Sequence, residues 1–390
     1  MTLTKPIQRM RHLQTQFFAE LEERVSTLQM AGYDLIRLDV GSPDLLPAPH
    51  IVQALAGAAR LPDRHGYQSH RGPLSLRQAW SELYRREFGV DLDPDSEVLP
   101  LLGSKEGIFH LMMACLEPGD LVVVPDPGYM TYARGARFAG AQVYETPLLP
   151  QNGYLPDLNA IPARVARQAK MMWLNYPNNP TGAVADLDFF ARAVAFAREN
   201  KLLLCHDAAY ALVTYDGYRS PSLLQVPGAA DVSIEFNSLS KSHNMAGWRV
   251  GVAVGQPESI QSLFNLKTNI DSGHFLPIWE ASIAAMTGDQ TWLPKRNRIY
   301  QRRRDLVVTS LRAMGLAAAL PRASIYVWCS IPAGWRSIDF SLALLEDAHL
   351  SLTPGTVFGA AGEGYARISL TAPQSRLETA MRRLEDWMNR

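Results

Sequence analysis

A lysine that directly follows an apolar run could act as a nucleophile in this chain. Lys241 comes after the run DVSIEF, within the serine-rich segment SLSKSHNMAGWR, which also holds Arg249. Burial at a strand end and a nearby cation both disfavour the charged ammonium, so they would lower the lysine pKa and leave an amine that attacks carbonyl carbon. A single lysine after a strand is usually a surface residue, so Lys241 alone establishes no function.

A carboxylate follows a second apolar run. Asp207 comes directly after LLLCH. A carboxylate buried at a strand end is costly unless it meets a cation. A helix N-cap or a structural ion pair would also explain this placement, so the meaning of Asp207 depends on the residues that gather around it.

Polar segments follow three further apolar runs: GSKEG after EVLPLL, DPGYMTY after LVVV, and NYPNNPTG after MMWL. In an open α/β sheet, ligands bind beyond the carboxyl ends of the strands, so these segments should meet at one edge. Together with Lys241 and Asp207 they supply the parts of a pyridoxal phosphate (PLP) site. Such a site needs a lysine for the Schiff base, a carboxylate for the pyridine nitrogen, donors to the ring oxygen and a phosphate cradle.

These motifs resemble those of the PLP-dependent fold-type I, class I and II aminotransferases. The most specific are NNPTG, DAAY, and SLSK followed by GWRVG, and the resemblance runs from about residue 10 to the C-terminus. It implies an α/β fold like that of aspartate aminotransferase, with a mostly parallel sheet in a large domain and a smaller α+β domain. It also implies transfer of an amino group between an L-amino acid and a 2-oxo acid, with 2-oxoglutarate and glutamate as the expected pair.

The resemblance gives the motif residues catalytic and cofactor-binding roles. Lys241 matches the Schiff-base lysine, which also serves as general base at the substrate Cα. Asp207 matches the partner of the pyridinium nitrogen. Tyr210 and Asn179 match the residues that hydrogen-bond the phenolic ring oxygen, and Asn179 also belongs to the expected substrate contacts. Tyr129 matches the aromatic residue that stacks on the pyridine ring, although a core aromatic is the alternative.

Two segments are expected to bind the cofactor phosphate. The first holds Ser104 and the amide of Lys105, at the N-terminus of a predicted helix whose free N–H groups favour an anion. The second holds Ser238 and Arg249, whose guanidinium can bind phosphate in a bidentate manner. An ordinary helix N-cap is the alternative interpretation of Ser104.

The substrate carboxylate has two expected partners. Arg367 matches the arginine that binds the α-carboxylate, and Gly41 in GSPD matches a glycine whose backbone approaches the same group. Alternation along YARISL predicts independently that Arg367 lies on the face opposite Ala366 and Ile368, away from the apolar core.

Tyr67 in HGYQSHRGPLSLR matches a tyrosine that reaches the phosphate of the neighbouring subunit, so we expect a homodimer with shared active sites. The expected small-molecule partners are an amino acid and a 2-oxo acid, and no metal is expected. With 38 Lys and Arg against 38 Asp and Glu, the chain has no net positive charge to attract nucleic acid or an anionic membrane.

Compartment is inferred from apolar runs and cysteines. No apolar run approaches the roughly 18–20 residues needed to cross a bilayer. Cys115, Cys205 and Cys329 are far apart and form no CxxC pair, which is typical of buried, reduced thiols in a cytoplasmic protein. We therefore expect a soluble, unprocessed, cytoplasmic protein.

The elements that must position these residues form two groups. Seven short aliphatic runs between about residues 97 and 255 alternate with helical stretches, as in an α/β domain. Two strands, SIYVWCSI and YARISL, and a final helix follow. We expect a large PLP-binding domain over 46–288 and a small domain formed by 1–45 and 289–390.

Two helices outside the main alternation are also predicted. Phe18, Leu21, Val25 and Leu28 recur at helical spacing near the N-terminus, which indicates an amphipathic helix. The basic stretch KRNRIYQRRRD is expected to form a solvated helix face rather than a ligand site.

Longer phrases resemble one branch of the family, the one that includes LL-diaminopimelate aminotransferases: NGYLPDLNAIP, PSLLQVPGA, IEFNSLSK and TNIDSGHF. Alanine, aspartate, methionine and broad-range or aromatic aminotransferases are the alternatives. A PLP β-lyase or decarboxylase on the same fold is a further one, because the same electron sink serves it. A PLP-binding DNA regulator is disfavoured, since no space remains for a winged helix-turn-helix and the net charge is zero.

A few residues depart from that branch. Ser242 and His243 stand where Thr-Tyr is more common, His274 stands where a small apolar residue is usual, and Met130 replaces a common proline. His70 and His274 could each lie near the pocket and change the accepted side chain. A hydrogen-bonded structural role is the alternative for each histidine.

Overall fold

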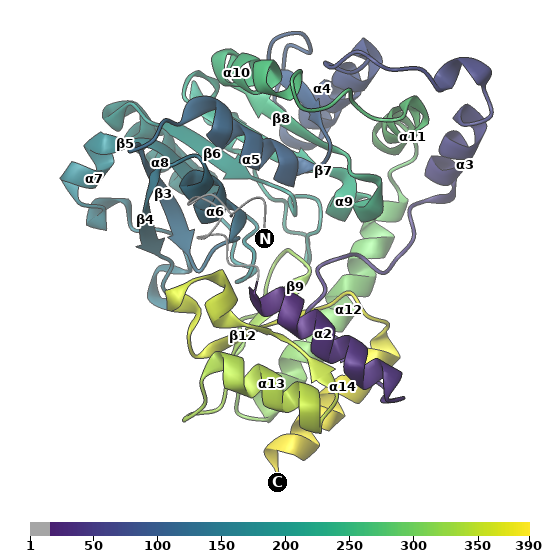
Figure 1. Cartoon of the computed structure of the whole chain (residues 1–390), viewed down its shortest axis with the longest axis vertical. Coiled ribbons are helices and arrows are strands. Elements are labelled where there is room, and N and C mark those ends of the chain that lie inside the picture. The colour runs from purple at the N-terminus through teal and green to yellow at the C-terminus, as the bar shows by residue number, and fades with distance from the viewer. Residues whose placement is uncertain (1–15) are drawn as a thin grey trace, which may run out of the picture.

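Seven strands form the main sheet of the computed structural model, which describes residues 16–390 (Figure 1). Their order is β2-β8-β7-β6-β5-β3-β4. The strands are β2 (Val98–Leu101), β3 (Leu121–Asp126), β4 (Gln142–Pro147), β5 (Ala169–Asn175), β6 (Leu203–Asp207), β7 (Ser233–Ser238) and β8 (Gly251–Gly255). β8 runs antiparallel to both of its neighbours, β2 and β7, and all the other pairs in the sheet are parallel. The prediction of a mostly parallel sheet is confirmed, and each of the seven predicted runs overlaps one strand.

Helices cover both faces of this sheet, as the continuous apolar runs of buried parallel strands require. Within β3, Val122 and Val124 belong to the core on one face, and Val123 belongs to the core on the other. The first face is covered by α5 (Ser104–Cys115), α6 (Thr131–Phe138) and α10 (Pro257–Lys267). The second is covered by α3 (Pro49–Ala58), α4 (Leu74–Phe88), α7 (Ala163–Gln168), α8 (Leu187–Asn200) and α11 (Leu276–Thr287).

A smaller region holds two further sheets. The antiparallel order is β11 (Thr353–Pro354), β12 (Tyr365–Ser369), β9 (Tyr326–Ser330), while β1 (Ile36–Arg37) pairs in parallel with β10 (Leu350–Ser351). The helices of this region are α2 (Gln16–Met30), α12 (Trp292–Ala313), α13 (Ser337–Asp347) and α14 (Gln374–Met388). Pairing of β1 with β10 joins both ends of the chain, while the exact domain boundaries stay a prediction.

The predicted N-terminal amphipathic helix corresponds to α2. Leu21 and Val25 are buried there and pack with Leu345 of α13. Leu28 packs against the same cluster from a partly buried position. The side chain of Phe18 and the residues before 16 lie outside the part of the chain that the structure describes.

The prediction of a solvated face holds for only half of the basic residues in this stretch of α12, because Lys295, Arg298 and Arg302 are exposed and the other three are buried. Arg296, Arg303 and Arg304 are only 3%, 4% and 2% exposed. Arg303 pairs with Asp44 at 2.7 Å, and Arg304 pairs with Asp216 at 2.6 Å. Figure 1 shows α12 running from the region of the main sheet to the smaller region, so its inward arginines meet acceptors from both. A run of basic residues in the sequence does not show such partners, because the partners come from distant segments of the chain.

The cysteines are free, but they are not all buried. Cys205 and Cys329 are buried as expected, whereas Cys115 is only partly buried, because it lies at the end of α5. Burial raises the pKa of the Cys115 thiol to about 11, which keeps it protonated and weakly nucleophilic. No helix within residues 16–390 is long and apolar enough to cross a membrane.

Candidate active site

A cavity of about 570 Å³ lies where β5, β6 and β7 end, and β9 and β12 contribute to its wall. It is the place that the rule for open α/β sheets indicates. The predicted site residues that line it are Gly41, Ser104, Lys105, Tyr129, Asn179, Asp207, Tyr210, Ser238, Lys241, Arg249 and Arg367. Segments separated by more than three hundred residues therefore meet at one place.

Lys241 projects into this cavity from α9 (Leu239–Ser242), a single turn that follows β7. Its ammonium donates a hydrogen bond to the carbonyl oxygen of Gly41. Burial, and then the nearby cations Arg367 and Arg249, lower the pKa of Lys241. These influences favour a neutral amine, which is the form that attacks carbonyl carbon.

Arg296 supports the lysine turn from behind, a role that the sequence did not reveal. Its guanidinium donates to the carbonyl oxygens of Lys241 at 2.6 Å and Ser242 at 2.8 Å. Because α9 is too short to satisfy its own C-terminal carbonyls, this arginine fixes where the lysine stands. The only sequence signal was the basic stretch, which gave no hint of the partner.

Asp207 ends β6 as a buried carboxylate with no ion-pair partner among residues 16–390. Its Oδ2 accepts a hydrogen bond from the hydroxyl of Tyr132 at 2.8 Å, and its Oδ1 accepts one from the amide of Ala209 at 3.2 Å. Burial raises the pKa of Asp207. A cation in the cavity would stabilise the ionised carboxylate and offset the unfavourable free energy of its burial. The protonated nitrogen of PLP is such a cation. The residues present therefore fit this cofactor.

Tyr326, which sequence reasoning missed, joins two predicted residues. The hydroxyl of Tyr210 donates to the Tyr326 hydroxyl at 3.1 Å. Burial opposes ionisation of Tyr326, but Arg367 and Lys241 outweigh burial and lower its pKa. A Cβ atom on Gly41 would lie 2.1 Å from the Tyr326 hydroxyl, so glycine is needed there. The sequence places Tyr326 in the predicted strand SIYVWCSI, but it does not show which residues Tyr326 contacts.

Arg367 is fixed in β12 by several acceptors. It donates to Oδ1 of Asn179 at 3.0 Å, to the carbonyl oxygen of Asp39 at 2.8 Å, and to the hydroxyl of Thr353 at 3.2 Å. Its guanidinium carbon lies 4.1 Å from the ring centre of Tyr326, within cation–π range. Its Nε is buried and has no partner among residues 16–390, so it remains able to bind a carboxylate.

The alternation predicted along β12 is found. Ala366 and Ile368 are fully buried in the apolar core, and Arg367 lines the cavity on the other face. That face is buried as well, since Arg367 is only 6% exposed. Alternation separates two faces of a strand, but it does not distinguish solvent from an enclosed polar site.

The expected phosphate cradle lies at the N-terminus of α5. Ser104 is the first residue of this helix and Gly103 takes the N-cap position, so the N-cap alternative for Ser104 is not found. A Cβ atom on Gly103 would lie 2.4 Å from Nη2 of Arg249, which shows how closely this guanidinium approaches the helix end. Ser238 is the N-cap of α9 and its hydroxyl donates to the carbonyl oxygen of Val250 at 3.0 Å.

Tyr67 is the one predicted site residue that does not line the cavity of its own chain. It is 94% exposed. Its predicted contact with the cofactor of a neighbouring subunit needs a second chain, so that role stays a prediction.

The three histidines singled out from the sequence do not line the cavity. His243 is buried, and its Nε2 lies 3.2 Å from Oε1 of Gln290. Burial, and then the charge of nearby Arg296, lower the pKa of His243 to about 3. Nδ1 of His70 lies 2.8 Å from the carbonyl oxygen of Asp271. Within this chain the structural alternative holds for these two histidines. His274 does not line the cavity either, but it lies beside the backbone of Arg249, which does.

Comparisons with known proteins agree with this geometry. Residues 33–384 match the family described as "Aminotransferase class I and II". A protein named LL-diaminopimelate aminotransferase from Moorella thermoacetica is 48% identical over 96% of this chain and 96% of its own. The substrate-bound structure of BacF from Bacillus subtilis has a TM-score of 0.95 at 38% identity, covering 99% of this chain and 98% of that one.

A second solved structure supports the fold more broadly. A single mutant of aspartate aminotransferase from Thermus thermophilus has a TM-score of 0.92 at 28% identity, covering 98% of this chain and 100% of that one. The predictions of family, fold class and cofactor are therefore confirmed.

Proposed function

This chain belongs to the class I and II aminotransferases, PLP-dependent transaminases, and from that premise we propose that it moves an amino group between LL-diaminopimelate and 2-oxoglutarate. The donor is suggested by the relative of 48% identity that carries this name. The observation that carries the mechanism is the meeting of Lys241, Asp207 and Arg367 around one cavity.

Asp207 supplies the electrostatic part of the reaction. When bound, PLP supplies a protonated ring that withdraws electrons from the substrate Cα. Asp207 would hold the proton on the pyridine nitrogen, because a buried carboxylate strongly favours a cationic partner. The bonds from Tyr132 and Ala209 keep the carboxylate oriented.

Lys241 is the group that moves the proton. Its Nζ would bond the cofactor in the resting enzyme and, once free, take the proton from the substrate Cα. Burial favours the neutral form that can accept this proton. Arg296 holds the backbone of the turn in place throughout.

The remaining residues orient the two ligands. Arg367 would bind the α-carboxylate of every amino donor, with its unpaired Nε as one available donor atom. Asn179 would donate to the phenolic oxygen of the cofactor, and Tyr210 would do so by turning its hydroxyl away from Tyr326. Ser104, Ser238 and Arg249 would bind the phosphate, with the N-terminus of α5 contributing its free amides.

Two further parts of the proposal concern the assembly and the compartment. A homodimer would give Tyr67 a partner, and Tyr67 and Leu46 are 94% and 84% exposed in the single chain. The enzyme would work in the cytoplasm, in amino-acid biosynthesis. Size-exclusion chromatography with light scattering tests the dimer, and a monomer with full activity would contradict it.

The function is tested by half-reactions. Purified holoenzyme is mixed with LL-diaminopimelate, glutamate, alanine, aspartate, methionine or an aromatic amino acid, and the visible absorbance of the cofactor is followed. We expect loss of the resting absorbance with LL-diaminopimelate and with glutamate, and its return with 2-oxoglutarate. Release of ammonia or carbon dioxide without any 2-oxo acid would instead support a lyase or decarboxylase.

A further inference from the structure

The cavity carries more positive charge than the proposed reaction uses. Its lining includes two carboxylates, Asp39 and Asp207. Its lining cations are Arg37, Lys105, Arg134, Lys241, Arg249 and Arg367. A cavity with this imbalance attracts anions, so the use of each cation matters.

One cation is neutralised within the protein. Arg37 forms two hydrogen bonds with Asp39, at 2.8 Å and 2.7 Å, and also pairs with Glu22 at 2.9 Å. Arg37 is therefore satisfied without any ligand. Asp207 is reserved for the cofactor nitrogen in the proposed function.

Three more cations have a use in the proposed reaction. Lys241 bonds the cofactor, Arg249 binds the phosphate, and Arg367 binds the α-carboxylate. Lys105 and Arg134 remain, and within residues 16–390 neither has an ion pair. Burial, and then the charges of Arg134 and Arg249, lower the pKa of Lys105, so this side of the cavity has a surplus of positive charge.

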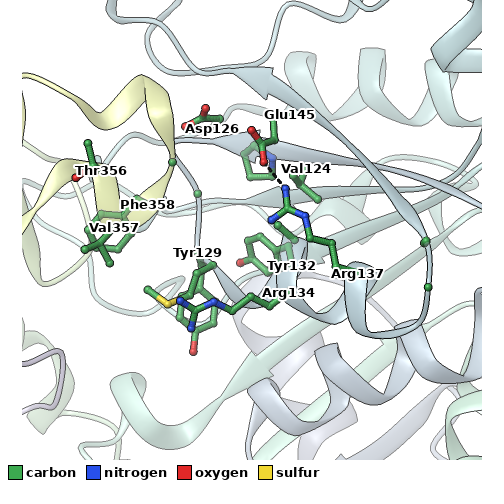
Figure 2. A pocket seen from close by; sticks show the side chains of 17 residues that line it. Val124, Asp126, Tyr129, Tyr132, Arg134, Arg137, Glu145, Thr356, Val357 and Phe358 are labelled. Atoms are coloured by element: carbon green, nitrogen blue, oxygen red, sulfur yellow. Dashed lines mark hydrogen bonds and ion pairs between the residues drawn. The ribbon is translucent and has the colours of Figure 1, made fainter. Parts of the chain in front are cut away.

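Arg134 stands where a substrate side chain could reach it. It lies on α6 and lines both the 570 Å³ cavity and a neighbouring cavity of about 660 Å³. Figure 2 shows its side chain extending toward Tyr129, the residue expected against the cofactor ring. It is thus at the boundary between the cofactor site and free space beyond it.

Arg137, one turn further along the same helix, shows the contrast. Its guanidinium pairs with Glu145 at 2.8 Å, the contact drawn as a dashed line in Figure 2. Arg137 lines the neighbouring cavity but not the cofactor cavity. Two arginines on one helix therefore differ in that only Arg137 has a carboxylate partner within the described chain.

We propose that Arg134 determines substrate specificity by binding the distal carboxylate of a dicarboxylic substrate, the glutamate and 2-oxoglutarate class, with Lys105 adding to the attraction. The inference rests on the proposed function, since it assumes that the α-carboxylate is taken by Arg367. A carboxylate at this point would pair with an arginine that otherwise has no counter-charge, and charge-assisted bonds of this kind are strong.

The first test compares two amino donors. In the Arg134→Ala holoenzyme, the single-turnover kcat/KM for glutamate should fall by about 10- to 100-fold. The value for alanine, which has no distal carboxylate, should change by less than about 3-fold, the scale expected when no bond is lost. Arg134→Lys should restore part of the loss, and Arg137→Ala is the matched control that should leave both values unchanged.

The second test needs no turnover. Calorimetry measures binding of glutarate and of pentanoate to the PLP-loaded protein. Glutarate should bind wild type more tightly than pentanoate, and Arg134→Ala should abolish that preference. If glutarate and pentanoate bind wild type equally, or if Arg134→Ala leaves the preference intact, the inference is wrong.

The remaining outcomes separate Arg134 from the cofactor. Equal losses for glutamate and alanine, accompanied by weaker PLP binding, would mean that Arg134 binds the cofactor phosphate, and this would overturn the inference. If wild type shows no cofactor change with any donor, the proposed function fails. The glutarate preference then still decides whether Arg134 binds a second carboxylate.

Discussion

The two walls of the cavity are built in different ways. On the wall of the main sheet, Asp207 and Ser238 end strands, and Lys241 follows within one turn. On the opposite wall, Arg367 and Tyr326 come from the small antiparallel sheet. The first wall holds the groups that every PLP reaction needs, and the second holds groups that meet the substrate. The difference teaches that the cofactor side can be inferred from local sequence, and the substrate side depends on distant contacts.

The largest effect is expected on the main-sheet wall, from Lys241→Ala. Loss of the proton-transferring amine should reduce turnover by at least about a thousandfold, while the phosphate contacts keep PLP bound. Steady-state kinetics and cofactor absorbance check this. Lys170→Ala, which removes an exposed lysine, should behave like wild type, and turnover near the wild-type rate in Lys241→Ala would refute the assignment.

Asp207→Asn should have the next largest effect. Without the carboxylate, the pyridine nitrogen loses its counter-charge, so kcat should fall by about a hundredfold while KM changes little. The matched control is Asp231→Asn, which removes an exposed carboxylate paired with Arg198. A larger change in KM than in kcat would place Asp207 in substrate binding instead.

On the opposite wall, Arg367→Ala should raise KM for every amino donor by about 10- to 100-fold, because all donors share the α-carboxylate. Kinetics with glutamate, alanine and LL-diaminopimelate check this. An effect confined to one donor would mean that Arg367 binds the substrate side chain instead. It would then not be a contact common to all donors, which would contradict the comparison of the two walls.

The smallest effect on turnover is expected from His243→Gln, just behind the main-sheet wall. The folded-state pKa of His243 is about 3, below its ordinary value. As pH falls below about 6.5, the unfolded chain therefore gains a proton that the folded protein does not, and stability is lost until the folded pKa is reached. Wild type should lose roughly 2–4 kcal/mol by this route between pH 6.5 and pH 4, and His243→Gln should lose less. Chemical denaturation at several pH values measures it, and identical acid sensitivity in both proteins would contradict the prediction.

Most of the fold and the cofactor wall could be predicted from the sequence. The seven runs of the main sheet are locally apolar and β-branched. The polar residues at or just after their ends, such as Asp207 and Lys241, are adjacent in the chain to the strands that position them. The position of Gly41 in the site followed from the family resemblance alone, and for Arg367 the local alternation gave the face of the strand but not what that face meets.

What could not be predicted depends on partners that are distant in sequence. The role of Tyr132 depends on its hydrogen bond to Asp207, and the role of Arg296 depends on its hydrogen bond to the carbonyl oxygen of Lys241. Neither contact could be read from the sequence. Arg134 stands out because it lacks the kind of partner that Arg137 has. The buried arginines of α12 were misjudged for the same reason, since charge alone does not say whether a counter-charge lies opposite.

The pairing of β1 with β10 has a consequence for the order of synthesis. A ribosome that has passed Gly255 has made all seven strands of the main sheet, with the lysine and the phosphate cradle. The pairing partner of β1 and the arginine for the substrate carboxylate are not yet made, because they lie at Leu350 and Arg367. A nascent chain can thus contain every strand of the cofactor wall about one hundred residues before it contains the arginine that the substrate needs.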